Sequence, residues 1–279
     1  FRRLFAEGAF IQSFVPILND YKTNHQQDLK KFISYVQGNL ALILIIIVSA
    51  GIIFSDQVIG AFAPGFENSG QRFNLSSDML KITFPYLFFI SLTAMSAGIF
   101  NTYNKFLLPS ITPVLLNISL IMFAVFASGL FQEPIMSLAY GVLVAGILQY
   151  LLQIPSLVKM DLFVIPRISF KFEGVNRVLK LMLPAMLGTA VIQINLIIDS
   201  IVASLLVAGS ISWLYYSDRL VELPLGVFGI AIATVILPKL SERFSKNSME
   251  EYSEMIKKAL KIAIVFSLPA MFGLLVLTE

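Results

Sequence analysis

Long apolar blocks separated by short polar connections set the pattern of this chain. Residues 40–54 and 115–130 contain no charged side chain. Extended by mildly polar flanks, such blocks reach the ~20 residues that span a bilayer as a helix. A membrane β-barrel would instead alternate apolar and polar residues along each strand. The pattern therefore predicts an all-α fold, a polytopic transmembrane helical bundle.

Eight apolar segments are predicted to be membrane-spanning helices. They cover residues 1–21, 32–54, 79–101, 108–131, 135–158, 178–207, 210–238 and 256–277,. Prolines such as Pro85 and Pro184 lie inside these segments. We expect them to kink the helices rather than end them, as prolines in membrane helices commonly do.

Basic residues are concentrated in alternate connections. The connections after the first, third, fifth and seventh segments hold three, one, five and six lysines and arginines, fifteen in all, whereas the opposite connections hold only Arg72 and Lys81. Cytoplasmic connections of membrane proteins carry the excess of Lys and Arg. Four connections are therefore predicted to be cytoplasmic, namely residues 22–31, 102–107, 159–177 and 239–255.

Composition agrees with this pattern and excludes several classes of function. The chain is 57% hydrophobic and 13% charged, whereas soluble domains are about 45–50% apolar and about 25% charged. It has no cysteine, and His25 is its single histidine, which excludes disulfides, thiolate chemistry and a histidine-based metal cluster. A pI near 9.0 would favour a nucleic-acid partner in a soluble protein,. The basic connections explain it here, so no nucleic-acid partner is expected.

An internal repeat relates the first and the seventh segments. Arg3-Leu4 leads through an apolar run to residues 15–18, and Arg219-Leu220 leads through a similar run to residues 235–238. The offset of 216 to 220 residues corresponds to six spans. An even number of spans places both copies in the same orientation, which is the parallel repeat of two-lobed transporters with a cavity between the lobes.

Charged side chains inside the predicted spans are the candidate functional residues. They are Arg2, Arg3, Glu7, Asp199, Asp218, Arg219 and Glu222. Each such charge costs at least ~2.5–3.5 kcal/mol on insertion scales. The spacing allows Arg219 to pair with Glu222, and Arg3 with Glu7.

Two interpretations of these charges remain open. They could be ion pairs that hold helices together. Alternatively, they could line a water-filled cavity that binds an anionic substrate or a coupling ion. The excess of arginine favours the second interpretation, because a guanidinium can hold phosphate in a bidentate manner. No H-E-x-x-H, G-x-S-x-G or P-loop pattern occurs,, so we do not expect an enzyme.

Several motifs resemble one family of membrane proteins. The opening residues 2–10 read R-R-L-F-A-E-G-A-F and continue to F-V-P-I-L at 14–18. Residues 63–66 (A-P-G-F), 81–86 (K-I-T-F-P-Y) and 113–119 (P-V-L-L-N-I-S) follow in order, and then residues 213–220 (W-L-Y-Y-S-D-R-L) and 222–224 (E-L-P). Spread over the whole chain, these motifs closely resemble the MurJ (MviN) lipid II flippases.

The resemblance implies a fold and a function. These proteins belong to the multidrug/oligosaccharidyl-lipid/polysaccharide (MOP) exporter superfamily and have fourteen spans, of which this chain would cover the second to the ninth. Both ends of the chain look cut from a longer one. By this resemblance, residues 1–172 would be the rest of an N-terminal lobe and residues 173–279 the start of a C-terminal lobe. The family moves the undecaprenyl-pyrophosphate-linked peptidoglycan precursor, lipid II, across the bacterial cytoplasmic (inner) membrane.

Roles for single residues also come from the resemblance. Arg2 and Arg219 match cavity arginines that contact the pyrophosphate, with Arg3 beside them. Glu7, Asp218 and Glu222 match acidic neighbours that hold or gate that cluster. Asp199 matches a position where sodium-coupled members have an ion-binding aspartate and other members a neutral residue, so the coupling cation, Na⁺ or another, stays open. No other cofactor is implied.

Partners and rival functions follow from the same resemblance. Lipid II and membrane lipids are the expected partners, with proteins of cell-wall synthesis as further candidates. One rival is another exporter of the superfamily that moves a different lipid-linked oligosaccharide or a drug. The other is a non-transporting membrane scaffold for cell-wall synthesis, whose buried charges would all be paired.

Overall fold

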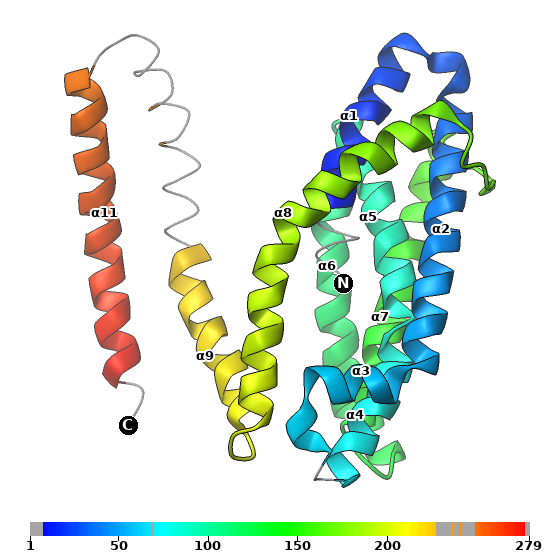
Figure 1. Ribbon diagram of the computed structural model, residues 1–279. Helices are drawn as coiled ribbons and strands as arrows, with labels where there is room; N and C mark the ends of the chain where they lie inside the picture. The colour runs from blue at the N-terminus through cyan, green and yellow to red at the C-terminus, as the bar shows by residue number, and fades with distance from the viewer. Residues whose placement is uncertain (1–7, 68–69, 227–235, 237–239, 241–248, 277–279) are drawn as a thin grey trace. The chain divides into compact units, whose positions relative to one another are not determined.

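The structure is a computed structural model (Figure 1) that describes residues 8–67, 70–226, 236, 240 and 249–276. Every regular element within these residues is helical, which confirms the predicted all-α fold. The chain forms two compact units, Phe1–Leu205 and Leu206–Glu279. The predicted lobes, 1–172 and 173–279, concern the complete transporter and stay a prediction.

Eight α-helices make up the described part of the first unit. They are α1 (Ala9–Asn24), α2 (Leu29–Ile53), α3 (Ser55–Phe62), α4 (Gly70–Thr83), α5 (Tyr86–Thr102), α6 (Leu107–Met122), α7 (Met136–Lys159) and α8 (Glu173–Ser204). Short helical turns join them, namely η2 (Gln26–Asp28), η3 (Pro64–Phe66), the π-helical η4 (Phe123–Ala127) and η5 (Ser128–Leu130). The second unit holds α9 (Ser210–Pro224) and α11 (Met249–Val276).

Five helical stretches in the described residues are long and apolar enough to cross a membrane. They are Gln26–Ile53, Gly70–Thr102, Leu107–Leu130, Met136–Lys159 and Glu250–Val276. Two arms of α8, which meet at an angle of 46°, make a sixth if they form one bent span. The predicted spans 1–21 and 210–238 include residues outside the described part. The chain is therefore a multi-pass membrane protein.

The segment predicted as one helix over 79–101 starts earlier and contains a break. Its first part, α4, begins at Gly70, and the chain turns at Phe84 and Pro85 before α5 begins. Proline has no N–H to donate to the carbonyl four residues earlier, so the ladder is interrupted there. Helix α3 was not predicted, because its eight residues are too short to give a spanning signal,.

Helix α1 lies at the centre of the first unit, where it packs on α2, α5 and α8 (Figure 1). Its buried face carries a row of aromatic side chains. Phe14 stacks on Phe32 of α2 with ring centroids 5.7 Å apart, and Tyr21 stacks on the same Phe32 at 4.4 Å. Offset stacking of this kind adds ~0.5–1.5 kcal/mol per pair beyond burial, so α1 and α2 are held in a fixed register.

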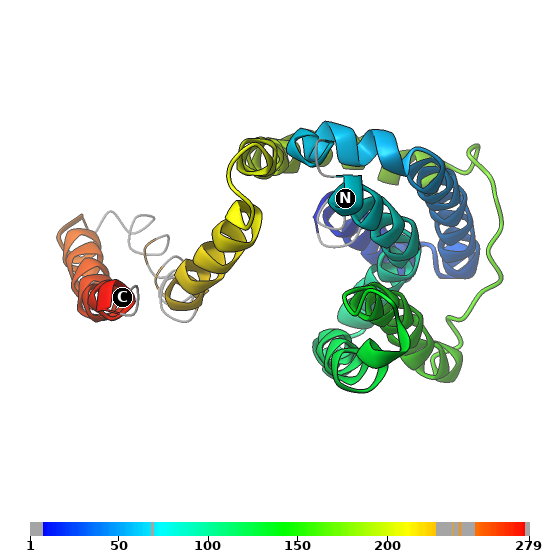
Figure 2. The same cartoon turned by 90° about the horizontal axis from the view of Figure 1, so that it is seen from below.

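An extended segment, residues 162–169, connects α7 to α8 and passes outside α2 (Figure 2). We call it the strap. The backbone N–H of Arg167 donates to the carbonyl of Ser34 at 3.1 Å, and the Ser34 hydroxyl donates to the carbonyl of Ile165 at 2.6 Å. The Asn39 amide donates to the carbonyl of Ser169 at 2.8 Å. Gly38 lets the strap approach, because a Cβ there would lie 2.2 Å from the Arg167 oxygen.

Candidate functional site

The predicted site residues fall into three groups in the structure. Arg2, Arg3 and Glu7 lie outside the described residues. Asp199 lies in the second arm of α8, within the first unit. Asp218, Arg219 and Glu222 lie together on α9, within the second unit.

Helix α9 begins directly after Gly209, whose φ of +106° lies in the left-handed region that glycine adopts without strain,. A side chain at this position would also approach the Trp213 ring, since a Cβ would lie 3.2 Å from it. The helix therefore starts at a sharp turn and presents Trp213, Tyr215 and Tyr216, all more than half exposed in the described chain.

Arg219 is the centre of the polar cluster on α9. Its Nη1 donates to Oε2 of Glu222 at 2.7 Å, one helical turn further along. Its guanidinium also lies 5.1 Å from the centroid of the Tyr215 ring, one turn earlier. The i, i+3 ion pair confirms the pairing predicted from the spacing, and the cation–π contact is an addition that the sequence analysis did not include.

This arrangement leaves Arg219 able to bind an anion. The guanidinium has five N–H donors, and its bond to Glu222 uses one of them,. Its side chain is 57% exposed and that of Glu222 is 52% exposed. Within the described part of the chain, the tyrosine face and the carboxylate therefore orient the guanidinium fork without covering it. Planar forks of this type suit phosphate oxygens.

Asp199 is an exposed side chain on α8. No group of three or more His, Cys, Asp or Glu side chains that could hold a metal gathers anywhere in the described part of the chain.

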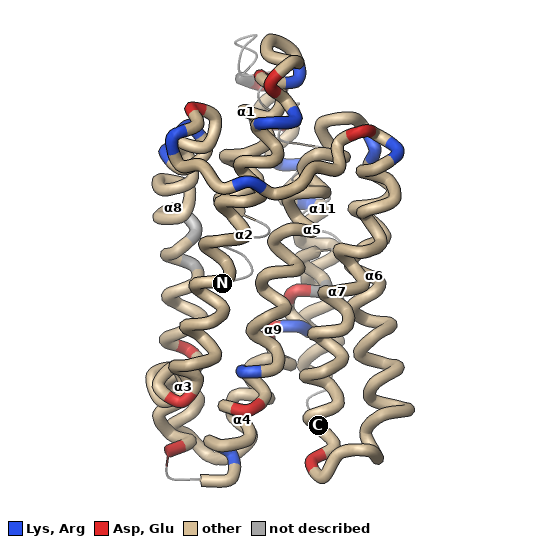
Figure 3. Tube along the Cα trace, turned by 90° about the vertical axis from the view of Figure 1, so that its right-hand side faces the viewer, with Lys and Arg blue, Asp and Glu red and all other residues tan. Residues whose placement is uncertain are grey.

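The connections predicted to be cytoplasmic meet at one end of the first unit. Lys22 donates to the carbonyl of Thr102 at 2.8 Å, and its ammonium lies 4.2 Å from the Tyr103 ring. Arg177 at the start of α8 donates to Asp20 at 2.8 Å. Figure 3 shows Lys and Arg residues spread over the end of the trace that bears the α1 label, whereas Arg72 and Lys81 lie on α4. Three of the four predicted connections thus share one end, and the fourth belongs to the second unit.

A pocket between α5, α6 and α7 that is lined in part by buried polar side chains was missed by the sequence analysis. Its volume is about 160 Å³, and its lining includes Thr93, Thr112, Gln149 and Gln153. The amide of Gln149 donates to the carbonyl of Thr112 and that of Gln153 to the hydroxyl of Thr112, both at 3.1 Å. Two glutamines four residues apart in an otherwise apolar span were the signal that could have revealed it.

The orientation of both glutamine amides is fixed by their partners. The Thr112 hydroxyl gives its proton to the carbonyl of Leu108 at 2.7 Å, so toward Gln153 it can only accept. The NH₂ groups therefore face Thr112, and the Oε1 atoms of both glutamines have no hydrogen-bond partner in the structure. Thr93 Oγ1 is unpartnered as well. Buried oxygens of this kind are costly in a membrane, and these can accept hydrogen bonds from a donor that enters the pocket.

Comparisons with known proteins cover the whole chain. A family model described as "Lipid II flippase MurJ" matches residues 1–279. The chain is 44% identical over 269 residues to the "Probable lipid II flippase MurJ" of Buchnera aphidicola subsp. Schizaphis graminum, covering 96% of this chain and 52% of that protein. It is 39% identical over 278 residues to the "Lipid II flippase MurJ" of Burkholderia cenocepacia, covering 98% and 54%.

A solved structure agrees in fold. The structure described as "Lipid II flippase MurJ, inward closed conformation" superposes with a TM-score of 0.80 at 33% sequence identity. The match covers 99% of this chain and 56% of that one. The chain thus spans about half the length of the relatives that it matches.

Proposed function

The chain belongs to the family of MurJ lipid II flippases, and from this membership we propose that it is part of a protein that moves lipid II across the bacterial cytoplasmic membrane. The observation that carries the proposal is the family match over residues 1–279. Transport of this kind breaks and forms no covalent bond, so the proposed protein is a transporter and not an enzyme.

In the proposed mechanism, the head group enters a basic cavity of the complete protein from the cytoplasmic side, with the polyprenyl tail remaining in lipid. Arg219 and Arg2 contact the pyrophosphate, and Arg3 adds positive charge. The half-exposed guanidinium fork of Arg219 supports this role on the α9 side. Reorientation of the two lobes then exposes the cavity to the outer face.

The acidic neighbours are proposed to reset the site. Glu222 accepts a hydrogen bond from Arg219 at 2.7 Å. A pyrophosphate carries more negative charge than one carboxylate, so it can replace Glu222 as the hydrogen-bond partner of the Arg219 guanidinium during binding. Glu222 then pairs with Arg219 again on release. Asp218 adjoins Arg219 on α9, and Glu7 is the corresponding acid in the first segment. We propose Asp199 as a ligand of a coupling cation, with sodium as the first candidate.

The orientation is part of the proposal. The basic end of the first unit, where Lys22 meets Thr102 and Arg177 meets Asp20, faces the cytoplasm. The excess of Lys and Arg in these connections supports this assignment.

Complementation tests the function. Cells depleted of their own flippase would receive the full-length protein or its variants, with membrane expression of each variant measured. Arg219→Ala should fail to support growth, because a charge-assisted hydrogen bond is worth ~1.5–3 kcal/mol. Arg219→Lys should rescue partly, since it keeps the charge but loses the fork.

The double variant Arg219→Ala/Glu222→Ala separates substrate binding from a structural ion pair. If Arg219 only neutralises Glu222, removing both charges should restore growth. If Arg219 binds pyrophosphate, the double variant should fail like the single one. Growth of the double variant at the wild-type rate would exclude Arg219 as a substrate ligand.

A further inference from the structure

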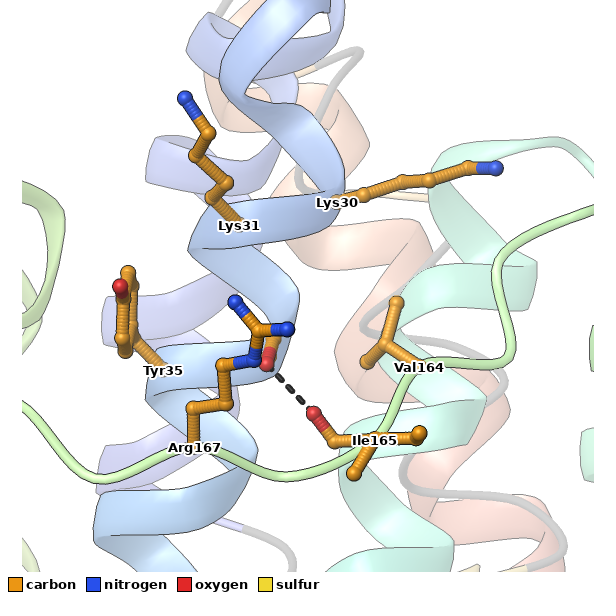
Figure 4. A pocket seen from close by; sticks show the side chains of 7 residues that line it. Lys30, Lys31, Tyr35, Val164, Ile165 and Arg167 are labelled. Atoms are coloured by element: carbon orange, nitrogen blue, oxygen red, sulfur yellow. Dashed lines mark hydrogen bonds between the residues drawn. The ribbon is translucent and has the colours of Figure 1, made fainter.

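The first two turns of α2 and the strap line an open pocket of about 260 Å³ (Figure 4). Its lining residues are Lys30, Lys31, Ser34, Tyr35, Val164, Ile165 and Arg167. Sites for drug-sized ligands measure ~300–1,000 Å³. The volume therefore suits a small charged group, such as a phosphate ester, rather than a whole large ligand.

Three basic side chains contribute to this pocket, and two of them already have an acidic partner. Lys30 pairs with Asp161, and Lys31 pairs with Asp28 at 2.9 Å. Arg167 makes no ion pair with any carboxylate in the described part of the chain. The pocket therefore has a surplus positive charge, and that charge is the guanidinium best suited to phosphate.

The backbone that carries Arg167 is held in place before any ligand binds. The Arg167 N–H donates to the carbonyl of Ser34. The carbonyl of Ile165, two residues before Arg167, accepts from the Ser34 hydroxyl, and the dashed line in Figure 4 marks this bond. Ordering a loop on binding costs free energy that a pre-ordered loop does not pay. The strap thus presents its arginine from a fixed position.

Four apolar side chains in the strap or directly after it are exposed. Ile165 is 76% exposed and Ile168 is 60% exposed, and Phe163 and Phe170 are each 46% exposed. Because the hydrogen bonds to α2 pin the strap, it cannot fold these side chains inward. Exposed aliphatic and aromatic groups next to basic residues are typical of segments that lie at a membrane surface.

The helix that carries the lysines of the pocket is long enough for its ends to reach the head-group layer. The helical stretch Gln26–Ile53 has 28 residues, which at ~1.5 Å per residue gives ~42 Å. The hydrocarbon core measures ~30 Å, so the ends of this stretch extend into the head-group layer. Lys30 and Lys31, the fifth and sixth residues of the stretch, line the pocket near its first end, and Tyr35 is the tenth residue.

We propose that this pocket binds the phosphate of an anionic phospholipid in the leaflet that the basic end faces. Arg167 holds the phosphate oxygens, Lys30 and Lys31 add positive charge, and Ile165 contacts the acyl chains beside the head group. The site does not depend on lipid II transport, so it can be confirmed or refuted whatever the outcome for the proposed function.

Native mass spectrometry of the full-length protein in detergent tests the site, with phosphatidylglycerol and phosphatidylcholine of identical acyl chains as probes. The test variant is Lys31→Gln/Arg167→Gln. The control is Lys105→Gln/Lys159→Gln, which removes two charges outside the pocket. At ~1 kcal/mol, or about fivefold, per basic residue near a lipid surface, the test variant should bind phosphatidylglycerol about 25-fold more weakly. The control should bind it as the wild type does.

Further variants and competitors test whether the bound phosphate belongs to a lipid and whether a loss of binding could come from misfolding. Ile165→Ser should weaken phosphatidylglycerol binding, and millimolar inorganic phosphate or glycerol phosphate should not displace the lipid. Arg167→Lys keeps the charge and should lose only part of the affinity. Equal losses in the test and control variants, equal binding of phosphatidylcholine, or displacement by inorganic phosphate would each overturn the proposal.

Discussion

Replacing Gly38 by alanine tests the strap directly. A Cβ at this position would lie 2.2 Å from the carbonyl oxygen of Arg167 and 2.7 Å from its nitrogen. A carbon–oxygen contact needs at least ~3.3 Å, so the strap backbone must move away by roughly 1 Å. Both clashing atoms are backbone, and no rotamer change can relieve the contact.

The magnitude follows from the hydrogen bonds that this movement breaks. Three bonds join the strap to α2 through Ser34 and Asn39. At ~0.5–1.5 kcal/mol net each, their loss costs ~1.5–4.5 kcal/mol. Alanine regains ~1 kcal/mol of helix propensity. A net loss of about 2 kcal/mol should lower the apparent Tm by ~4–8 °C, at the 2–4 °C per kcal/mol usual for domains of 150–250 residues.

Two measurements on the purified full-length protein would check this. The first is thermal unfolding in detergent. The second is limited trypsin digestion, because Arg167 and Lys171 become cleavable once the strap leaves α2. Gly188→Ala is the matched control, since this glycine also lies within a helix and its Cβ would meet nothing within 4 Å. Equal Tm values and equal rates of trypsin digestion for the Gly38→Ala and Gly188→Ala proteins would refute the contact between Gly38 and the strap.

Three further predictions concern other parts of the molecule. Thr112→Val leaves the buried NH₂ of Gln153 without its acceptor and should lower the free energy of unfolding by ~1–3 kcal/mol. The double variant Thr112→Val/Gln153→Met should recover most of that stability in thermal unfolding. If the effects of the two single changes simply add, the hydrogen-bond assignment is contradicted. If Asp199 binds sodium, added Na⁺ should stabilise the wild type by RT ln(1 + [Na⁺]/Kd) and so raise its Tm. The Tm of Asp199→Asn should not change with Na⁺. A wild-type Tm that does not depend on Na⁺ would refute the assignment. A single cysteine replacing Lys105 should react with membrane-impermeant maleimide only after cells are opened, and labelling of intact cells would invert the proposed orientation.

The spans and the local pairing could be predicted because both depend on residues close in sequence. Apolar runs such as 40–54 have one stable form in lipid, and a helix places Arg219 and Glu222 on one face. The contacts between Ser34 and Ile165 join residues 131 positions apart and leave no local pattern. The role of Gly38 is equally hidden, since only the folded chain brings Arg167 against it. The same applies to the pocket of Gln149 and Gln153, whose partner Thr112 lies on another helix.

The contacts that close the basic end of the first unit also bear on how the protein is made. The partners of these early residues are made much later. The carbonyl that Lys22 contacts lies 80 residues further along the chain, the carboxylate that Lys30 contacts 131 residues further, and the arginine that contacts Asp20 157 residues further. At ribosomal rates of ~5–20 residues per second, Arg177 is made roughly 8–30 s after Asp20,. During that interval α1 and α2 stand in the bilayer with their charged ends unmatched. The stacking of Phe14 and Tyr21 on Phe32 needs no later residue, so it can hold α1 against α2 until α8 is made.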